Sequence, residues 1–283
     1  MRATLASAGH VHGTATDVDA WALLEGAALA AVGVAAALYA IALWTSRRRS
    51  PWPLGRTLCW FAGIVCAALA LGPIARAAHE SFTAHMVGHL LLGMLAPLLL
   101  VLGAPVTLAL RALPVDDARA LSRLLRSPVV RWVTHPIVAA VLNAGGLWLL
   151  YGPGLGPTAS DDAGLFALMH GSAIVHAVVH LHIFLAGYVF TASIVGRDPD
   201  PHRASLAVRA AVLIAFIAVH SMLAKRLYGH PPAGVDALDA QVGSQVMYYG
   251  GDAVDVTLMV LLGLGWFAAT RPRPGAVPVA ATT

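Results

Sequence analysis

The sequence predicts an all-α membrane protein: one polytopic bundle of seven transmembrane helices, with the N-terminus outside the cell and the C-terminus in the cytoplasm. Three observations lead to this fold class. Of the 283 residues, 58% are hydrophobic and 11% are charged, whereas a soluble domain carries about 25% charged residues. The hydrophobic residues form seven stretches long enough to cross a bilayer. The basic residues lie mostly in the loops on one side, as the positive-inside rule expects.

Short polar links separate the predicted spans. In chain order the spans cover about residues 21–45, 57–77, 84–110, 132–151, 169–196, 206–223 and 246–269. Pro97 predicts a kink in the third span, which neighbouring membrane helices tolerate. The link 111–131 contains five arginines and predicts a short amphipathic helix at the membrane surface.

The predicted spans divide the chain into three regions. Residues 1–20 are polar and are expected to form a flexible extracytoplasmic segment. Residues 21–270 form the single seven-helix transmembrane domain. Residues 271–283 form a cytoplasmic tail.

The orientation rests on the distribution of the basic residues. With the N-terminus outside, 14 of the 18 lysines and arginines fall in the cytoplasmic links and tail. The outer side then has Arg2, Arg76, Lys225 and Arg226. The predicted location is therefore the plasma membrane, with lipid as an obligatory partner.

The same orientation places eleven of the 13 histidines on the outer side. His85 and His89 lie four residues apart in the third span, and His176 and His180 repeat that spacing in the fifth. Residues four apart share one face of a helix. Ionisable groups within a membrane helix are costly, so they are functional candidates by default. The alternative is that these histidines only form hydrogen bonds between helices.

Two such pairs, on two helices, offer enough imidazoles to surround a metal ion or to clamp a haem. Imidazole suits copper or zinc, and thioether sulfur suits Cu(I). We therefore predict a metal site at His85, His89, His176 and His180, with further candidate ligands His79, Met86 and Asp252. Asp252 and Asp255 could orient a ligating imidazole or, equally, cap the N-terminal end of the last helix. The roles of His170, His182, His220 and His230 stay open.

Several function classes are excluded. The chain contains neither G-x-S-x-G nor H-E-x-x-H, the motifs of common hydrolases, and we expect it not to be an enzyme. The arginines lie in short loops beside apolar spans, so no nucleic-acid partner is expected. Cys59 and Cys66 lie seven residues apart on one helix and cannot easily form a disulfide. Lys225 precedes the last span, whereas a retinal protein needs a lysine within it.

Three segments carry a resemblance to a known family. The stretch A-H-M-V-G-H-L-L-L-G-M-L-A-P-L-L-L-V-L-G-A-P-V-T-L, residues 84–108, resembles a signature of the CtaG family of cytochrome c oxidase assembly factors. The pattern H-x-x-x-H-x-H-x-F-L-x-G at 176–187, followed by G-R-D-P, is similar to a second signature. The segment D-A-Q-V-G-S-Q-V-M-Y at 239–248 is a weaker match, because Ser244 and Tyr248 replace a glycine and a tryptophan that the family usually has.

The resemblance implies a multi-pass membrane factor, without redox chemistry of its own, that helps to mature a haem-copper oxidase by delivering copper. The outer histidines would receive copper from an extracytoplasmic carrier and release it to an oxidase subunit docked alongside. A bis-histidine membrane cytochrome is an alternative. A copper transporter is another, although it would need polar residues throughout the membrane depth, and the inner halves of the spans have few.

Overall fold

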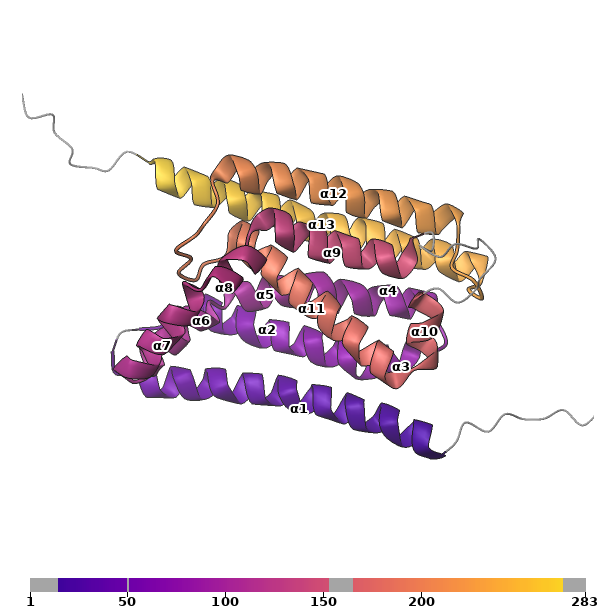
Figure 1. Cartoon of the computed structure of the whole chain (residues 1–283), viewed down its shortest axis with the longest axis horizontal. Helices are drawn as coiled ribbons and strands as arrows, with labels where there is room; N and C mark the ends of the chain where they lie inside the picture. The colour runs from indigo at the N-terminus through magenta and orange to yellow at the C-terminus, as the bar shows by residue number, and fades with distance from the viewer. Residues whose placement is uncertain (1–14, 50, 153–164, 272–283) are drawn as a thin grey trace, which may run out of the picture.

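A computed structural model describes residues 15–49, 51–152 and 165–271. This part of the chain is helical and contains no strand (Figure 1). The helices are α1 (Ala15–Ser46), α2 (Leu54–Leu71), α3 (Pro73–Ala77), α4 (Phe82–Leu90), the π-helical turn η1 (Leu91–Leu95), α5 (Ala96–Leu102), α6 (Pro105–Ala112), α7 (Val115–Leu125), α8 (Pro128–Val133), α9 (Pro136–Tyr151), α10 (Leu165–Gly171), α11 (Ala173–Val195), α12 (Leu206–Gly229) and α13 (Ala237–Thr270).

Within the described residues, six helical segments are long and apolar enough to cross a membrane. They are Ala20–Ser46, Leu54–Ala77, Phe82–Leu102, Ala173–Val195, Leu206–Gly229 and Ala237–Thr270. The predicted fourth span is the shorter α9, which has 16 residues and begins at Pro136 instead of at residue 132. At 1.5 Å per residue it reaches about 24 Å, less than the hydrocarbon thickness of about 30 Å. The multi-pass helical fold is confirmed, whereas the seventh span and the orientation stay predictions.

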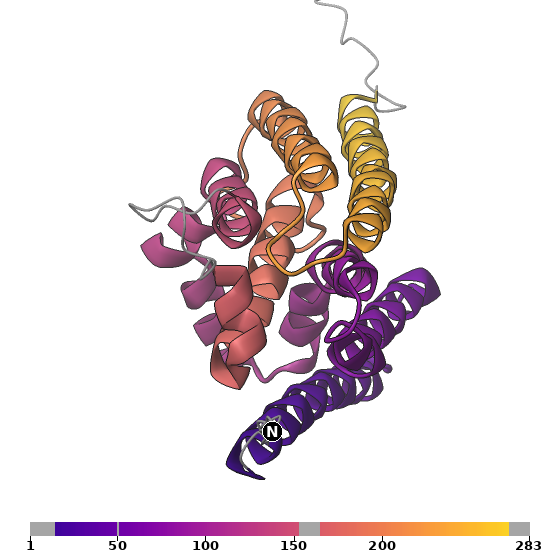
Figure 2. The same cartoon turned by 90° about the vertical axis from the view of Figure 1, so that its right-hand side faces the viewer.

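The third span, made of α4, η1 and α5, is the centre of the bundle. Two thirds (67%) of its most apolar stretch is buried, against at most 28% for each of the other candidate spans. Helices α2, α11 and α13 pack against it, while α12 packs on α13 and α9. Helix α1 lies at the edge, with 6% of its apolar stretch buried (Figures 1 and 2).

The two ends of the bundle differ in charge. Helices α3, α4 and α10 begin or lie at one end, which we call the histidine-rich end, to the right in Figure 1. Helices α6, α7 and α8 lie at the other, which we call the arginine-rich end. Helix α7 carries charged and apolar residues on different faces, so the amphipathic helix predicted in the link 111–131 is present.

The kink predicted at Pro97 takes the form of the π-helical turn that precedes it. Proline has no N–H, so it cannot donate to the carbonyl four residues back, that of Gly93. Gly187 of α11 lies directly against that carbonyl, and a Cβ at residue 187 would overlap the Gly93 oxygen. The third and fifth spans therefore touch through their backbones.

Helix α5 ends at Leu102, so the prediction that the third span continues to residue 110 is wrong. The chain turns at Gly103 and at Ala104, whose φ of 50° is left-handed, and α6 begins at Pro105. The Tyr39 hydroxyl of α1 donates to the Gly103 carbonyl at 2.9 Å. The turn is thus tied to α1 at the edge of the bundle.

Two aspartates from other parts of the chain hold the start of this central segment and the start of α6, which follows it. At the histidine-rich end, the carboxylate of Asp239 accepts from the Phe82 N–H at 2.6 Å and the Thr83 N–H at 3.0 Å. At the arginine-rich end, the carboxylate of Asp198 accepts from the Thr107 N–H at 2.7 Å and the Val106 N–H at 3.3 Å. Both satisfy free N–H groups and complement the positive end of a helix.

Two other predicted boundaries are corrected. The fifth span is not one helix from 169 to 196, because Ser172 ends α10 and caps α11 by accepting from the Val175 N–H. The last span begins at Ala237, with Asp236 as its cap. Asp252 and Asp255 therefore lie in the middle of α13, and the expectation that they cap its N-terminal end is wrong. Helix α1 begins at Ala15, and residues 1–14 and 272–283 of the predicted tails lie outside the described residues.

We expect Gly187→Ala to lower the free energy of unfolding by about 1–3 kcal/mol, because the new methyl group must push two backbones apart. The measurement is the thermal unfolding midpoint in detergent. Gly263→Ala on α13 is the matched control, since a Cβ there meets nothing within 4 Å. Equal midpoints for the two variants would show that the spans do not touch as described.

Candidate metal centre

The histidines of the histidine-rich end form two groups. We call His79, His176 and His180 the cavity histidines, because all three line a cavity of about 510 Å³ between α1, α2 and α11. We call His85 and His89 the buried histidines, because their exposed fractions are 5% and 6%. The sequence predicted all five as ligands, and the structure separates them by surroundings.

The cavity histidines lie close together. The rings of His176 and His180 stack with their centroids 3.9 Å apart, and the His79 ring stacks on His176 at 6.1 Å. Trp21 of α1 packs edge-on against His79 at 5.1 Å and against His176 at 5.0 Å. The first turns of α1 therefore cover this group from the side of the cavity.

Hydrogen bonds indicate which ring nitrogens are free. His180 Nδ1 lies 2.9 Å from the His176 carbonyl, which can only accept, so Nδ1 carries the proton. A neutral His180 then has its lone pair on Nε2. His176 Nδ1 is buried and has no partner among the described residues. Both imidazoles can thus offer a nitrogen to a metal ion.

The buried histidines have different partners. His85 Nε2 lies 2.6 Å from the hydroxyl of Tyr151, the last residue of α9. His170 of α10 packs beside His85, with ring centroids 5.6 Å apart, and its Nδ1 donates to the Phe166 carbonyl at 2.9 Å. Both ring nitrogens of His89 are buried without a hydrogen-bond partner in the described part of the chain. An unpaired buried polar group is costly and is a marker of function.

The two groups lie in one layer without forming a coordination sphere. His85 lies near enough to His180, His89, His170 and His176 for charges on these rings to repel one another. Yet among the described residues no three His, Cys, Asp or Glu side chains converge closely enough to hold a metal ion. The structure thus brings the predicted histidines near one another, and their role as ligands stays a prediction.

The two other predicted ligands lie elsewhere. Met86 is fully buried on the side of α4 that faces Gly243 of α13, and it does not line the cavity. Asp252 is half-buried in the middle of α13, where its charge interacts with that of Asp255. No contact in the described residues joins either one to the cavity histidines.

A further set of polar side chains continues into the core. His220 of α12 is 2% exposed, its Nε2 has no partner in the described chain, and its ring lies against Gly251. Asp255 is 1% exposed, and neither of its carboxylate oxygens has a partner there. His89 interacts electrostatically with His220. Asp255 could have been recognised as a functional candidate from the sequence, because a charged residue within an apolar span is unusual. It was instead interpreted as a cap at the start of the last helix.

His182 and His230 do not join these groups. His182 Nε2 lies 3.1 Å from the Leu142 carbonyl of α9, and its ring fills the space beside Gly146. His182 is therefore a hydrogen-bond donor between helices. His230 is an exposed residue at the end of α12. Tyr151, by contrast, could not be recognised from the sequence, because only the fold reveals that it contacts His85.

Comparison with known proteins supports the resemblance. A model of the Caa3_CtaG family, described as cytochrome c oxidase caa3 assembly factor, matches residues 37–269. Uncharacterized proteins of Mycobacterium bovis and Mycobacterium tuberculosis are each 36% identical to the chain over 199 residues, which is 68% of this chain and 28% of each relative. An uncharacterized protein of Mycobacterium leprae is 32% identical over 183 residues, 62% of this chain and 26% of the relative. The chain thus matches less than a third of the length of these relatives. No solved structure matches it.

We expect Tyr151→Phe to destabilise the protein by about 1–3 kcal/mol, because it leaves the buried His85 Nε2 without a partner. Thermal unfolding of chelator-treated protein in detergent measures this. Tyr249→Phe is the control, since Tyr249 is 67% exposed. If both variants unfold at the wild-type temperature, the His85–Tyr151 hydrogen bond does not contribute to the fold.

Proposed function

Because the chain belongs to the Caa3_CtaG family of cytochrome c oxidase assembly factors, we propose that it carries copper to a haem-copper oxidase in the plasma membrane. The observation that supports this most directly is the cavity lined by His79, His176 and His180. In this proposal, copper is the cargo that the protein carries. The protein binds and releases it and catalyses no reaction.

The donor set suits such a cargo. Neutral imidazole nitrogens are good ligands for copper, and His176 and His180 each have a ring nitrogen that no other group occupies. The rings line a cavity that Trp21 of α1 partly covers, and in this proposal an incoming carrier protein reaches the ion when this cover moves aside. A site with few ligands and open access favours exchange over permanent retention.

The buried histidines provide a second binding position in this proposal. His89 has two unpartnered nitrogens, and His85 shares its Nε2 with the Tyr151 hydroxyl. Copper that reaches this position is shielded from water by α9, α10 and α13. An oxidase subunit that docks beside the bundle would receive copper within the membrane layer.

The proposed topology has seven spans, with α9 as the fourth, and places the histidine-rich end outside the cell. This orientation is supported by the excess of arginines at the opposite end, where α6, α7, α8 and the link between α11 and α12 lie (Figure 1). Under the positive-inside rule, the end with more arginines faces the cytoplasm. The cavity histidines then face the compartment from which an extracytoplasmic copper carrier would approach.

The two alternatives are weaker. A bis-histidine cytochrome holds the haem between imidazoles from two helices. On α4, however, His85 Nε2 already lies 2.6 Å from the Tyr151 hydroxyl, and the His89 ring is 6% exposed and packed beside Gly93, which leaves no room for a haem plane on this side. A copper transporter gains some support from His220 and Asp255. Beyond them, however, the core towards the arginine-rich end is closed by apolar side chains, which include Phe190, Leu213, Phe216, Leu258 and Leu262.

We expect His176→Ala and His180→Ala each to remove most of the copper bound per chain, and the double variant to lose little more, since ligands of one ion act together. Copper content of purified protein and oxidase activity of the cells are the two measurements. His182→Ala is the matched control on the same helix, because His182 is turned towards α9.

Full copper and full oxidase activity in both single variants and in the double variant would contradict the copper site. Equal losses in His182→Ala would show that the effect is general destabilisation of α11. Normal copper content with lost oxidase activity would place the function in docking to the oxidase.

A further inference from the structure

A second cavity, of about 640 Å³, lies at the arginine-rich end, between α2, the link that joins α11 to α12, and α13. Its polar lining residues are Arg56, Arg197, Asp198, Asp200, Arg203 and Arg209. None of them belongs to the cavity histidines or the buried histidines, so the inference drawn from this cavity does not rest on the proposed copper function.

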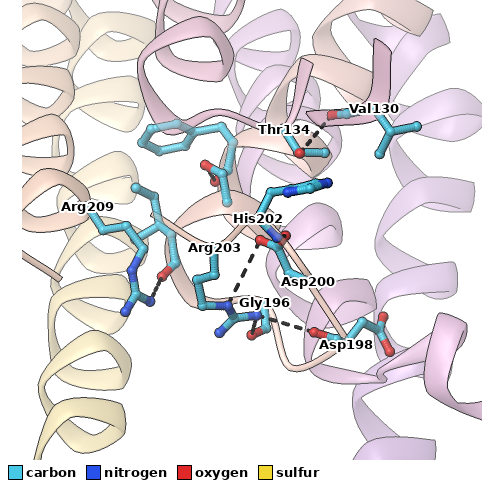
Figure 3. A network of polar contacts seen from close by, with 11 residues as sticks. Val130, Thr134, Gly196, Asp198, Asp200, His202, Arg203 and Arg209 are labelled. Carbon is cyan, nitrogen blue, oxygen red and sulfur yellow. Dashed lines mark hydrogen bonds and ion pairs between the residues drawn. The ribbon is translucent and has the colours of Figure 1, made fainter. Parts of the chain in front are cut away.

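The guanidinium groups are held in place by the backbone. Arg203 donates to the carbonyl of Gly196 at 2.6 Å and to that of Asp198 at 3.2 Å, and its closest carboxylate is that of Asp200 at 4.0 Å (Figure 3). Arg209 donates to the Ile194 carbonyl at 2.9 Å. These bonds use neutral acceptors, so they position the charges without neutralising them, and the Asp200 carboxylate offsets part of the positive charge.

The cavity has an excess of positive charge. Four arginines line it against two aspartates, and the Asp198 carboxylate is already engaged by the start of α6. Arg203 and Arg209 are close enough for their charges to repel each other. Arg209 Nε is buried and has no partner among the described residues. An anion in this cavity would relieve the repulsion and satisfy a buried donor.

The rest of the lining is apolar and lies mostly on α13. Residues of α13 form this wall: Leu261, Leu262, Leu264, Gly265, Ala268 and Ala269. Leu264 is 59% exposed, as expected for a side chain in contact with hydrocarbon. A Cβ on Gly265 would meet nothing within 4 Å, so open space adjoins the wall at this point.

A ligand that fits must be anionic at one end and apolar along its length. We propose that this cavity binds an anionic phospholipid, with its phosphate among Arg197, Arg203 and Arg209 and an acyl chain along α13. Basic pockets between membrane helices are known binding sites for such headgroups. A free phosphate ion would use the arginines but not the apolar wall.

The test is the thermal unfolding midpoint of the purified, delipidated full chain in detergent, titrated with phosphatidylglycerol, phosphatidylcholine or inorganic phosphate. Phosphatidylglycerol is expected to raise the midpoint the most. Arg197→Gln is expected to weaken its apparent affinity roughly fivefold, from about 1 kcal/mol per basic residue. Arg197 is exposed and has no bond to the protein in the described structure, so the variant leaves the fold unchanged.

A second variant tests the apolar wall. Gly265→Leu adds an apolar side chain to the wall at a position where a Cβ meets nothing within 4 Å, and it is expected to weaken phosphatidylglycerol binding while leaving any phosphate effect unchanged. Arg48→Gln, which removes a charge at the same end but outside the cavity, is expected to bind as the wild type does. Equal stabilisation by phosphatidylcholine, a full effect of inorganic phosphate alone, or an equal loss in Arg48→Gln would each overturn the proposal.

Discussion

The contact between the backbones of Gly93 and Gly187 determines where the histidines lie. Pro97 leaves the Gly93 carbonyl without its usual donor, and only a glycine at 187 can approach it. This contact sets the register of the third and fifth spans. Along the helices, His85 lies about 12 Å and His180 about 10 Å from the contact. The two therefore lie at nearly the same distance along their helices from this contact, and near enough for charges on the two rings to repel each other.

The segments that resemble family signatures contact one another in the fold. Asp239, which opens the weakest of the three matches, holds the start of α4. Asp198 of the G-R-D-P segment holds the start of α6, directly after the G-A-P turn. In a membrane, free N–H groups at helix ends need such partners, because lipid offers none. These signatures are thus explained by the architecture as much as by the histidines they contain.

The sequence could predict the helical membrane fold, because hydropathy and charge asymmetry act over whole spans. It could also predict the i, i+4 histidine pairs, because helical periodicity places such residues on one face. It could not predict the break at Ser172, since hydropathy hardly changes there and the cap is a single side chain. The predicted start of the last span lies about ten residues after the observed start of α13, because the first turns of this helix are polar.

The candidate site was predicted less completely than the fold. Ring orientation and tertiary partners decide which nitrogens are available, and neither follows from spacing. Tyr151 occupies one nitrogen of His85, whereas His182, only two residues from His180, is turned towards α9. His220 and Asp255 could be recognised as unpartnered only after α4, α12 and α13 had been packed together.

Copper X-ray absorption spectroscopy, together with a visible spectrum of the same purified protein, tests the central claim most directly. The account predicts bound copper, scattering from at least two imidazole rings, and no Soret band. Absence of copper, or copper without imidazole scattering, would contradict the histidine site, and a Soret band would show that the histidines hold a haem instead.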